Sequence, residues 1–240
     1  MTAPVNFAVL DRDLRAVLHP TAAPIAITFS AQVPSGVPAY DAPLHDPGPD
    51  GRQGRVAAGC VFWMKSTDTT FSTVAADHSN CSVGSLTHGL ASFEDVAGNS
   101  DVAAMLGTGW VTPEMIPEIP TVKERPGAIT YGPLLDATDP DVVLVRLTAK
   151  SLMVLSDALP GLRIEGKPQC HIIAAAKEQG DVVASVGCIA SRTRTGMPST
   201  EMTCAIPASR LGEVIEAVRA TAEVDSAIAS YASADAQRFA

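Results

Sequence analysis

The sequence is poor in aromatic residues, in charged residues and in runs of basic residues. Phe, Trp and Tyr make up 5% of the 240 residues, and charged residues make up 18%. The core therefore has to be built mainly from Val, Ala, Leu and Ile. The densest basic stretch is only three residues long, at 192–194, and the formal net charge is −9. Because an acidic surface repels a phosphate backbone, we expect no nucleic-acid partner.

Two further absences concern membranes and location. No uncharged apolar run approaches the length of a membrane span. The N-terminus has no basic region followed by an apolar one, as a secretory signal would. We therefore expect a cytoplasmic protein with no membrane partner. Hydrophobic residues still make up 46% of the chain, which excludes a disordered protein and allows a sizeable core.

Several common catalytic motifs are also missing. The chain has no phosphate-binding loop for nucleotides, no glycine-rich dinucleotide turn, no nucleophile elbow and no zinc-protease helix. This disfavours a nucleotide-using enzyme and a standard hydrolase. It also has no C-x-x-C pair, the usual signal of a zinc or iron–sulfur site.

Cysteines are the most informative residues that are present. There are five, at positions 60, 81, 170, 188 and 204. In a reducing cytoplasm they are not expected to form structural disulfides, and their odd number also argues against a fully paired framework. The remaining roles are buried apolar residue, metal ligand and reactive thiol.

Local patterns predict a mixture of helices and strands. We expect helices at 6–20, 82–93, 100–106 and 148–159, a helix that starts at Ser209, and a last helical segment at 224–231. Strands are expected at 25–29, 56–65, 70–76 and 141–147, with a β-hairpin formed by 169–176 and 181–186. Residues 32–55 are rich in Pro and Gly, so they predict a long loop.

An internal repeat organises these elements. In each half a cysteine begins an apolar strand, a turn and a second strand follow, and another cysteine comes next: Cys60 and Cys81, then Cys170 and Cys188. A Glu-Met pair followed by Ile-Pro also recurs, at 114–120 and 201–207. We therefore predict an α/β or α+β fold of two degenerate half-domain repeats, each with a strand, a hairpin and a helix, packed about a pseudo-two-fold axis.

The halves would span residues 1–130, with the loop 32–55, and 131–240, with the C-terminal helices, in one compact unit. Packing about such an axis would bring four cysteines to one site. Cys81 and Cys188 each follow a strand and precede a turn or helix start, where the helix dipole is expected to lower the pKa of a thiol. Cys60 and Cys170 are either core residues or further ligands.

Two other residues are candidate site residues. His78 lies three residues before Cys81 and could act as a base. Arg192 follows Cys188 and could hold a carboxylate, a phosphate or an anionic cluster.

Four segments resemble a bacterial and archaeal family known as domain of unknown function 169. They are GCVFW at 59–63, NCSVG at 80–84, VGCIASR at 186–192 and EMTCAIP at 201–207. The resemblance covers about residues 20–220. It implies the architecture and the positions of the cysteines, but no reaction. The chain has Ala190 where the family pattern Gly-Cys-x-Gly-x-Arg has its second glycine.

Three hypotheses follow for the function. The first is a metalloprotein that holds an iron–sulfur cluster, or another thiolate-bound metal, on Cys60, Cys81, Cys170 and Cys188, with a small anionic substrate under the loop 32–55. The second is a metal-free thiol enzyme, with Cys81 or Cys188 as nucleophile and His78 as base. The third is a non-catalytic small-molecule binding protein. A homodimer is the default assembly.

Overall fold

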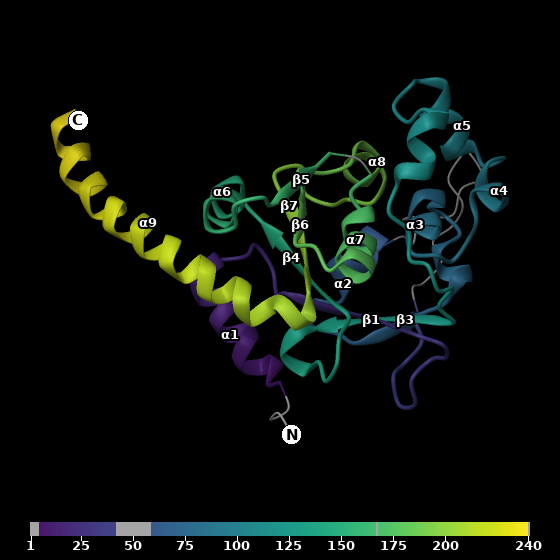
Figure 1. The fold of residues 1–240 in the computed structure, drawn as a ribbon, viewed down its shortest axis with the longest axis horizontal. Helices are drawn as coiled ribbons and strands as arrows, with labels where there is room; N and C mark the ends of the chain where they lie inside the picture. Colours follow the sequence, from purple (N-terminus) through teal and green to yellow (C-terminus); the bar gives the residue numbers. More distant parts are fainter. Residues whose placement is uncertain (1–4, 42–58, 167, 240) are drawn as a thin grey trace.

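A computed structural model describes residues 5–41, 59–166 and 168–239. Most of the predicted loop 32–55 lies outside these residues. The fold is mixed α/β, and the described strands form a seven-stranded sheet in the order β2-β3-β1-β4-β7-β6-β5 (Figure 1). Neighbouring strands are antiparallel except for β5 and β6. Their bounds are β1 (Ile25–Ser30), β2 (Phe71–Thr73), β3 (Ala128–Pro133), β4 (Val142–Leu147), β5 (Arg163–Glu165), β6 (Val183–Ser185) and β7 (Met202–Pro207).

Strand order and register match in the two halves of the sheet. β1 and β4 pair with each other at the centre; β3 then β2 follow on one side, and β7 then β6 on the other. Ile25, the first residue of β1, pairs with Pro133 at the end of β3. Val142, the first residue of β4, pairs with Pro207 at the end of β7 in the same way.

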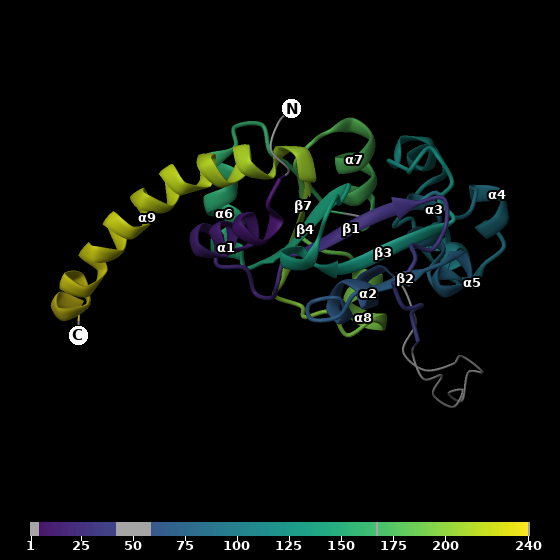
Figure 2. The same cartoon turned by 90° about the horizontal axis from the view of Figure 1, so that it is seen from below.

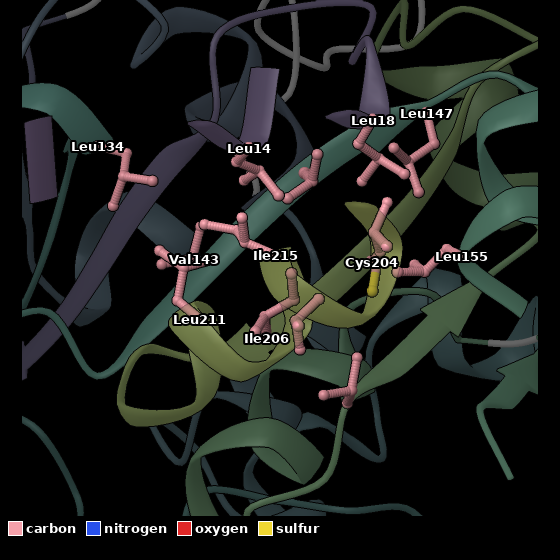
Figure 3. Close-up of a cluster of buried hydrophobic side chains, with 14 of the residues drawn as sticks. Leu14, Leu18, Leu134, Val143, Leu147, Leu155, Cys204, Ile206, Leu211 and Ile215 are labelled. Carbon is pink, nitrogen blue, oxygen red and sulfur yellow. The ribbon is translucent and has the colours of Figure 1, made fainter. Parts of the chain in front are cut away.

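One face of the sheet is covered by α1 (Phe7–Leu18), α6 (Ala149–Ala158) and α9 (Leu211–Phe239). Asn6 caps α1 by accepting a hydrogen bond from the Val9 amide. Figure 3 shows the core that these helices form with the sheet, with Cys204 of β7 inside it. In Figures 1 and 2 the C-terminal half of α9 extends well beyond the sheet.

The other face carries α2 (Gly59–Lys65) and α7 (His171–Gln179), with α3 (Ser82–Thr87) and α8 (Ile189–Arg194) beside them. Both α2 and α7 were expected to be strands, and that prediction is wrong. Their apolar residues are buried nearly all round, with Phe62 and Trp63 at 0% exposure. Such a run lacks the one-sided pattern that distinguishes helix from strand.

The turn predicted between two hairpin strands is instead the end of α7. Gly180 has a φ of 72° and forms the left-handed cap of that helix. Ser209 likewise lies within a 3-10 turn, η4 (Ala208–Arg210), and α9 then runs as one helix through the segment 224–231.

The second sequence correspondence, between 114–120 and 201–207, is not a structural one. Residues 202–207 form β7, whereas the earlier segment forms the 3-10 helix η2 (Pro113–Glu118). The strand at the place equivalent to β7 is β3. The remaining short elements are η1 (Ala75–His78), α4 (Phe93–Val96), α5 (Ser100–Gly107) and η3 (Leu134–Asp136).

Among the described helices, none combines the length and the apolar character that crossing a membrane would require.

Candidate functional site

The four cysteines predicted as metal ligands line one cavity of about 600 Å3. Cys60 lies in the first turn of α2, and Cys170 directly precedes α7. Cys81 and Cys188 directly precede α3 and α8. In Figure 1 these four helices gather on the same side of the sheet. Each half of the chain therefore supplies two of the four thiols.

Every one of these four thiols interacts electrostatically with the other three. Burial, and then the neighbouring thiols, raise the pKa of Cys60 to about 12. Burial also raises the pKa of Cys170 well above its usual value. A thiolate is costly in an apolar cavity beside other thiolates. Without a counter-charge, Cys60 and Cys170 are therefore protonated at neutral pH.

Cys81 caps the N-terminus of α3. Its Sγ accepts a hydrogen bond from the Gly84 amide at 3.4 Å. This bond lowers the pKa of Cys81, but burial raises it by more, and the net shift is upward. The expectation that the helix N-terminus would lower the pKa of this thiol is therefore wrong, because removal from water outweighs the local amide.

Cys188 is presented by a turn that depends on glycine. Gly187 has a φ of 133°, and a Cβ on it would lie 2.7 Å from Nη2 of Arg192. Arg192 also donates to the backbone oxygen of Glu201 and, at 3.3 Å, to Oε1 of Gln169, the residue before Cys170. Arg192 thus braces the turns that carry both cysteines of the second half.

Hydroxyl side chains of each half lie near a cysteine of the other half. Ser191 of α8 lowers the pKa of Cys60 on α2. Thr87 of α3 lowers the pKa of Cys170, at the start of α7. Both effects are smaller than the rise in pKa caused by burial.

A segment that the sequence did not single out covers the cavity. It comprises residues 100–110, which form α5 and the turn after it, and we call it the roof. Asp101 accepts hydrogen bonds from the amide and the hydroxyl of Ser82, at 3.0 and 2.7 Å. Its Oδ2 lies 3.6 Å from Nη1 of Arg194 on α8. The roof is thereby tied to two of the helices that present cysteines.

His78 lies outside the described lining of the cavity. It is fully buried and packs against Phe62, with ring centroids 4.7 Å apart. Its Nε2 lies 2.9 Å from Oγ1 of Thr73, whose own proton goes to the carbonyl of Ile129. His78 therefore donates from Nε2, and its Nδ1 is unprotonated. Burial lowers the pKa of His78 well below its usual value, so the ring is neutral.

The other histidines of this region are buried too. His88 donates from Nδ1 to the carbonyl of Gly84 at 2.8 Å, and burial lowers its pKa to about 4. His171 has its Nε2 3.9 Å from a carboxylate oxygen of Glu165. Neither ring lines the cavity as described.

The other predicted residues are placed as follows. Arg192 lies behind the described cavity wall, and Arg194, two residues further on, lines it. Cys204 is on the opposite face of the sheet. In the described part of the chain, no three His, Cys, Asp or Glu side chains are grouped closely enough to hold a single metal ion. The four thiols instead line a larger space, the cavity of about 600 Å3.

The fold and the cavity together define a class: an α/β protein whose two halves enclose a pocket with four cysteines. The chain belongs to the family of uncharacterised ArCR proteins, domain of unknown function 169, whose sequence profile matches residues 13–217. This confirms the family resemblance seen in the sequence. No curated protein and no solved structure gives a significant match.

Proposed function

We propose that this protein binds an iron–sulfur cluster on Cys60, Cys81, Cys170 and Cys188. The observation that carries the proposal is that these four thiols line one cavity. Four cysteine thiolates are the usual ligand set of iron–sulfur clusters, and soft sulfur ligands select such centres.

A metal centre at this site has to displace the protons of buried thiols. Burial and mutual repulsion raise the pKa of Cys60 and of Cys170. A metal centre supplies the positive charge that allows such thiols to ionise and bind. Arg192 and Arg194 add to this charge, since they lower the pKa of Cys60 and of Cys81 respectively.

The size of the cavity favours a centre of several atoms. A single tetrahedral zinc ion needs its sulfur ligands about 2.3 Å from the metal. The four sulfur atoms must then lie close to one another. A volume of about 600 Å3 leaves room for a polynuclear cluster. The Gly84 amide that donates to Sγ of Cys81 is the kind of hydrogen bond that tunes such a cluster.

The arrangement of the sheet supports a ligand set made by two repeats. Cys60 and Cys170 lie at the start of the helices before β2 and β6, and Cys81 and Cys188 precede the helices after them. β2 and β6 occupy equivalent places in the strand order. We infer that the halves are repeats related by a pseudo-two-fold axis, and that the site lies between them.

A metal-free thiol enzyme is less well supported. Its proposed base, His78, is buried against Phe62 and bonded to Thr73. Of its two candidate nucleophiles, Cys81 and Cys188, Cys81 has a raised pKa, whereas a catalytic thiol needs a lowered one. The cytoplasmic location and the homodimer stay predictions.

The test is anaerobic purification followed by iron and sulfide analysis, a visible spectrum and electron paramagnetic resonance. We expect a brown protein with iron and acid-labile sulfide. Replacing Cys60, Cys81, Cys170 or Cys188 by Ala should remove most of the iron. Cys204→Ala is the matched control, because Cys204 packs in the core on the other face of the sheet, and it should keep its iron.

Two results would overturn the proposal. One is a folded wild-type protein that holds no iron after purification and after reconstitution with iron and sulfide. The other is iron that survives all four alanine variants. Stoichiometric zinc without sulfide would assign the cysteines to a mononuclear site instead.

A further inference from the structure

The lining of the cavity contains more than the four cysteines. The roof supplies Ala104, Met105 and Trp110, and α3 and α8 add Val83 and Ile189. A volume of about 600 Å3 is typical of pockets that bind small organic molecules. Four cysteines and a cluster account for one part of the lining and leave the apolar part without a ligand group.

The roof is specific to the first half of the chain. Residues 88–127 connect α3 to β3, whereas residues 195–201 are enough to connect α8 to the equivalent strand β7. The extra residues of the first half include α4, α5 and η2. The roof thus belongs to a long connection that the second half lacks, and its apolar side chains line the same cavity as the cysteines.

Arg194 provides a positive charge at the edge of this cavity. Its Nη2 donates to the backbone oxygen of Asn80 at 3.0 Å, which uses one of the five N–H donors of a guanidinium. Asp101, 3.6 Å away, already accepts hydrogen bonds from Ser82 and from the amide of Val102. Arg194 therefore has further N–H groups that can donate to a ligand beside the apolar side chains of the cavity.

We propose that the cavity binds a small organic anion with a flat apolar body. The apolar body packs against Met105 and Trp110, and the anionic group accepts hydrogen bonds from Arg194. Aromatic and thioether side chains make favourable contacts with flat apolar groups. A guanidinium binds carboxylates and other planar oxyanions in a bidentate manner. A role for this ligand as a substrate of the cluster rests on the proposed function. Binding of the ligand does not require the cluster.

The test uses two probes with nearly the same body: anilinonaphthalene sulfonate, which is an anion, and phenylnaphthylamine, which is neutral. Each is titrated into the purified 240-residue chain, and the fluorescence of the probe is read. We expect the anionic probe to bind more tightly. Arg194→Gln should weaken it about tenfold and leave the neutral probe unchanged, as expected for the loss of a charged hydrogen bond. Arg194→Lys should restore part of the preference.

Two further variants locate the binding. Ala104→Trp fills the cavity from the roof and should abolish binding of both probes. Arg219→Gln is the matched control, because Arg219 lies on α9 and pairs with Glu216 on the surface. It should change neither affinity. Thermal melts check that each variant is folded.

Equal affinities of the two probes in the wild type, or binding that survives Ala104→Trp, would overturn the inference. Iron and sulfide are measured on the same preparation, so the two proposals fail separately. Arg194-dependent binding without iron would end only the cluster proposal. An iron-loaded protein with no preference for the anion would end only this one.

Discussion

Oδ2 of Asp101 and Nη1 of Arg194 lie 3.6 Å apart and join α5 to α8 across the edge of the cysteine cavity. The same carboxylate holds Ser82, the residue after Cys81. One side chain therefore ties the roof to the first residue of α3 and to the last residue of α8. We therefore expect the access of reagents to the thiols to depend on this contact.

Asp101→Ala should make the cavity easier to open. Among the hydrogen bonds that the variant loses are the two from Ser82 to the carboxylate. Hydrogen bonds to a charged group contribute about 1.5–3 kcal/mol each. If opening of the roof becomes easier by about 1.4 kcal/mol, the cavity thiols of metal-free protein should react about ten times faster with an aromatic disulfide reagent. Asp95→Ala, which removes the hydrogen bond from the Ser92 amide in the capping box of α4, is the control. An unchanged rate of thiol modification in Asp101→Ala would show that other contacts hold the roof in place.

The metal-free protein should lose stability at alkaline pH. The pKa of Cys60 is about 12 in the folded state and 9.0 in the absence of burial. Above pH 9 the unfolded chain releases this proton and the folded chain keeps it, so the unfolded state is favoured as pH rises towards 12. Urea unfolding between pH 8 and 11 measures this effect. The free energy of unfolding should fall less steeply with pH in Cys60→Ala than in wild type, by up to about 1.4 kcal/mol per pH unit. Equal slopes would contradict the raised pKa.

Gly187→Ala should disturb the turn that presents Cys188. The added Cβ would stand 2.7 Å from Arg192, at a φ that side chains rarely adopt. A strained backbone of this kind costs about 1–3 kcal/mol. We expect a lower urea midpoint and a lower iron content. Gly212→Ala is the control, since its Cβ meets no atom within 4 Å and its φ is ordinary for a helix. It should be as stable as wild type or more so.

Glu201→Gln should destabilise the fold strongly. Arg146 and Glu201 form a buried ion pair, with Nη2 and Oε2 2.7 Å apart and both side chains about one-tenth exposed. Removing the carboxylate leaves a buried guanidinium without its counter-charge, at a cost of about 3–5 kcal/mol. Glu216→Gln breaks an exposed pair with Arg219 and should have little effect. Chemical denaturation of both variants measures the difference.

Much of the fold could be predicted from local signals. The helix over 7–18 has a capping Asn6 and a one-sided apolar pattern, and the strand over 142–147 is a bounded apolar run. The sequences of α2 and α7 give no such contrast, because both helices are buried nearly all round. Their Val, Phe and Ile residues favour strands as strongly as helices.

The candidate site was predictable only in its cysteines. Their order in two similar halves indicates that four thiols meet, and the structure places them on one cavity. The roof and Arg194 carry no comparable signal. Asp101 acts on Ser82 and Arg194, which are far from it in the chain, and such contacts exist only after folding. For Cys81 the local sequence predicted a lowered pKa. The pKa is raised instead, because burial by distant segments outweighs the hydrogen bond from the Gly84 amide.

The central pairing of β1 with β4 has a consequence for how the pocket is assembled. These two strands are where one half of the sheet meets the other. A chain cut between η3 and β4 would give two fragments with two pocket thiols each, and each would have an unpaired strand edge. Neither fragment could enclose a ligand alone. The pocket therefore closes only when the N-terminal and C-terminal parts of the sheet pair through β1 and β4.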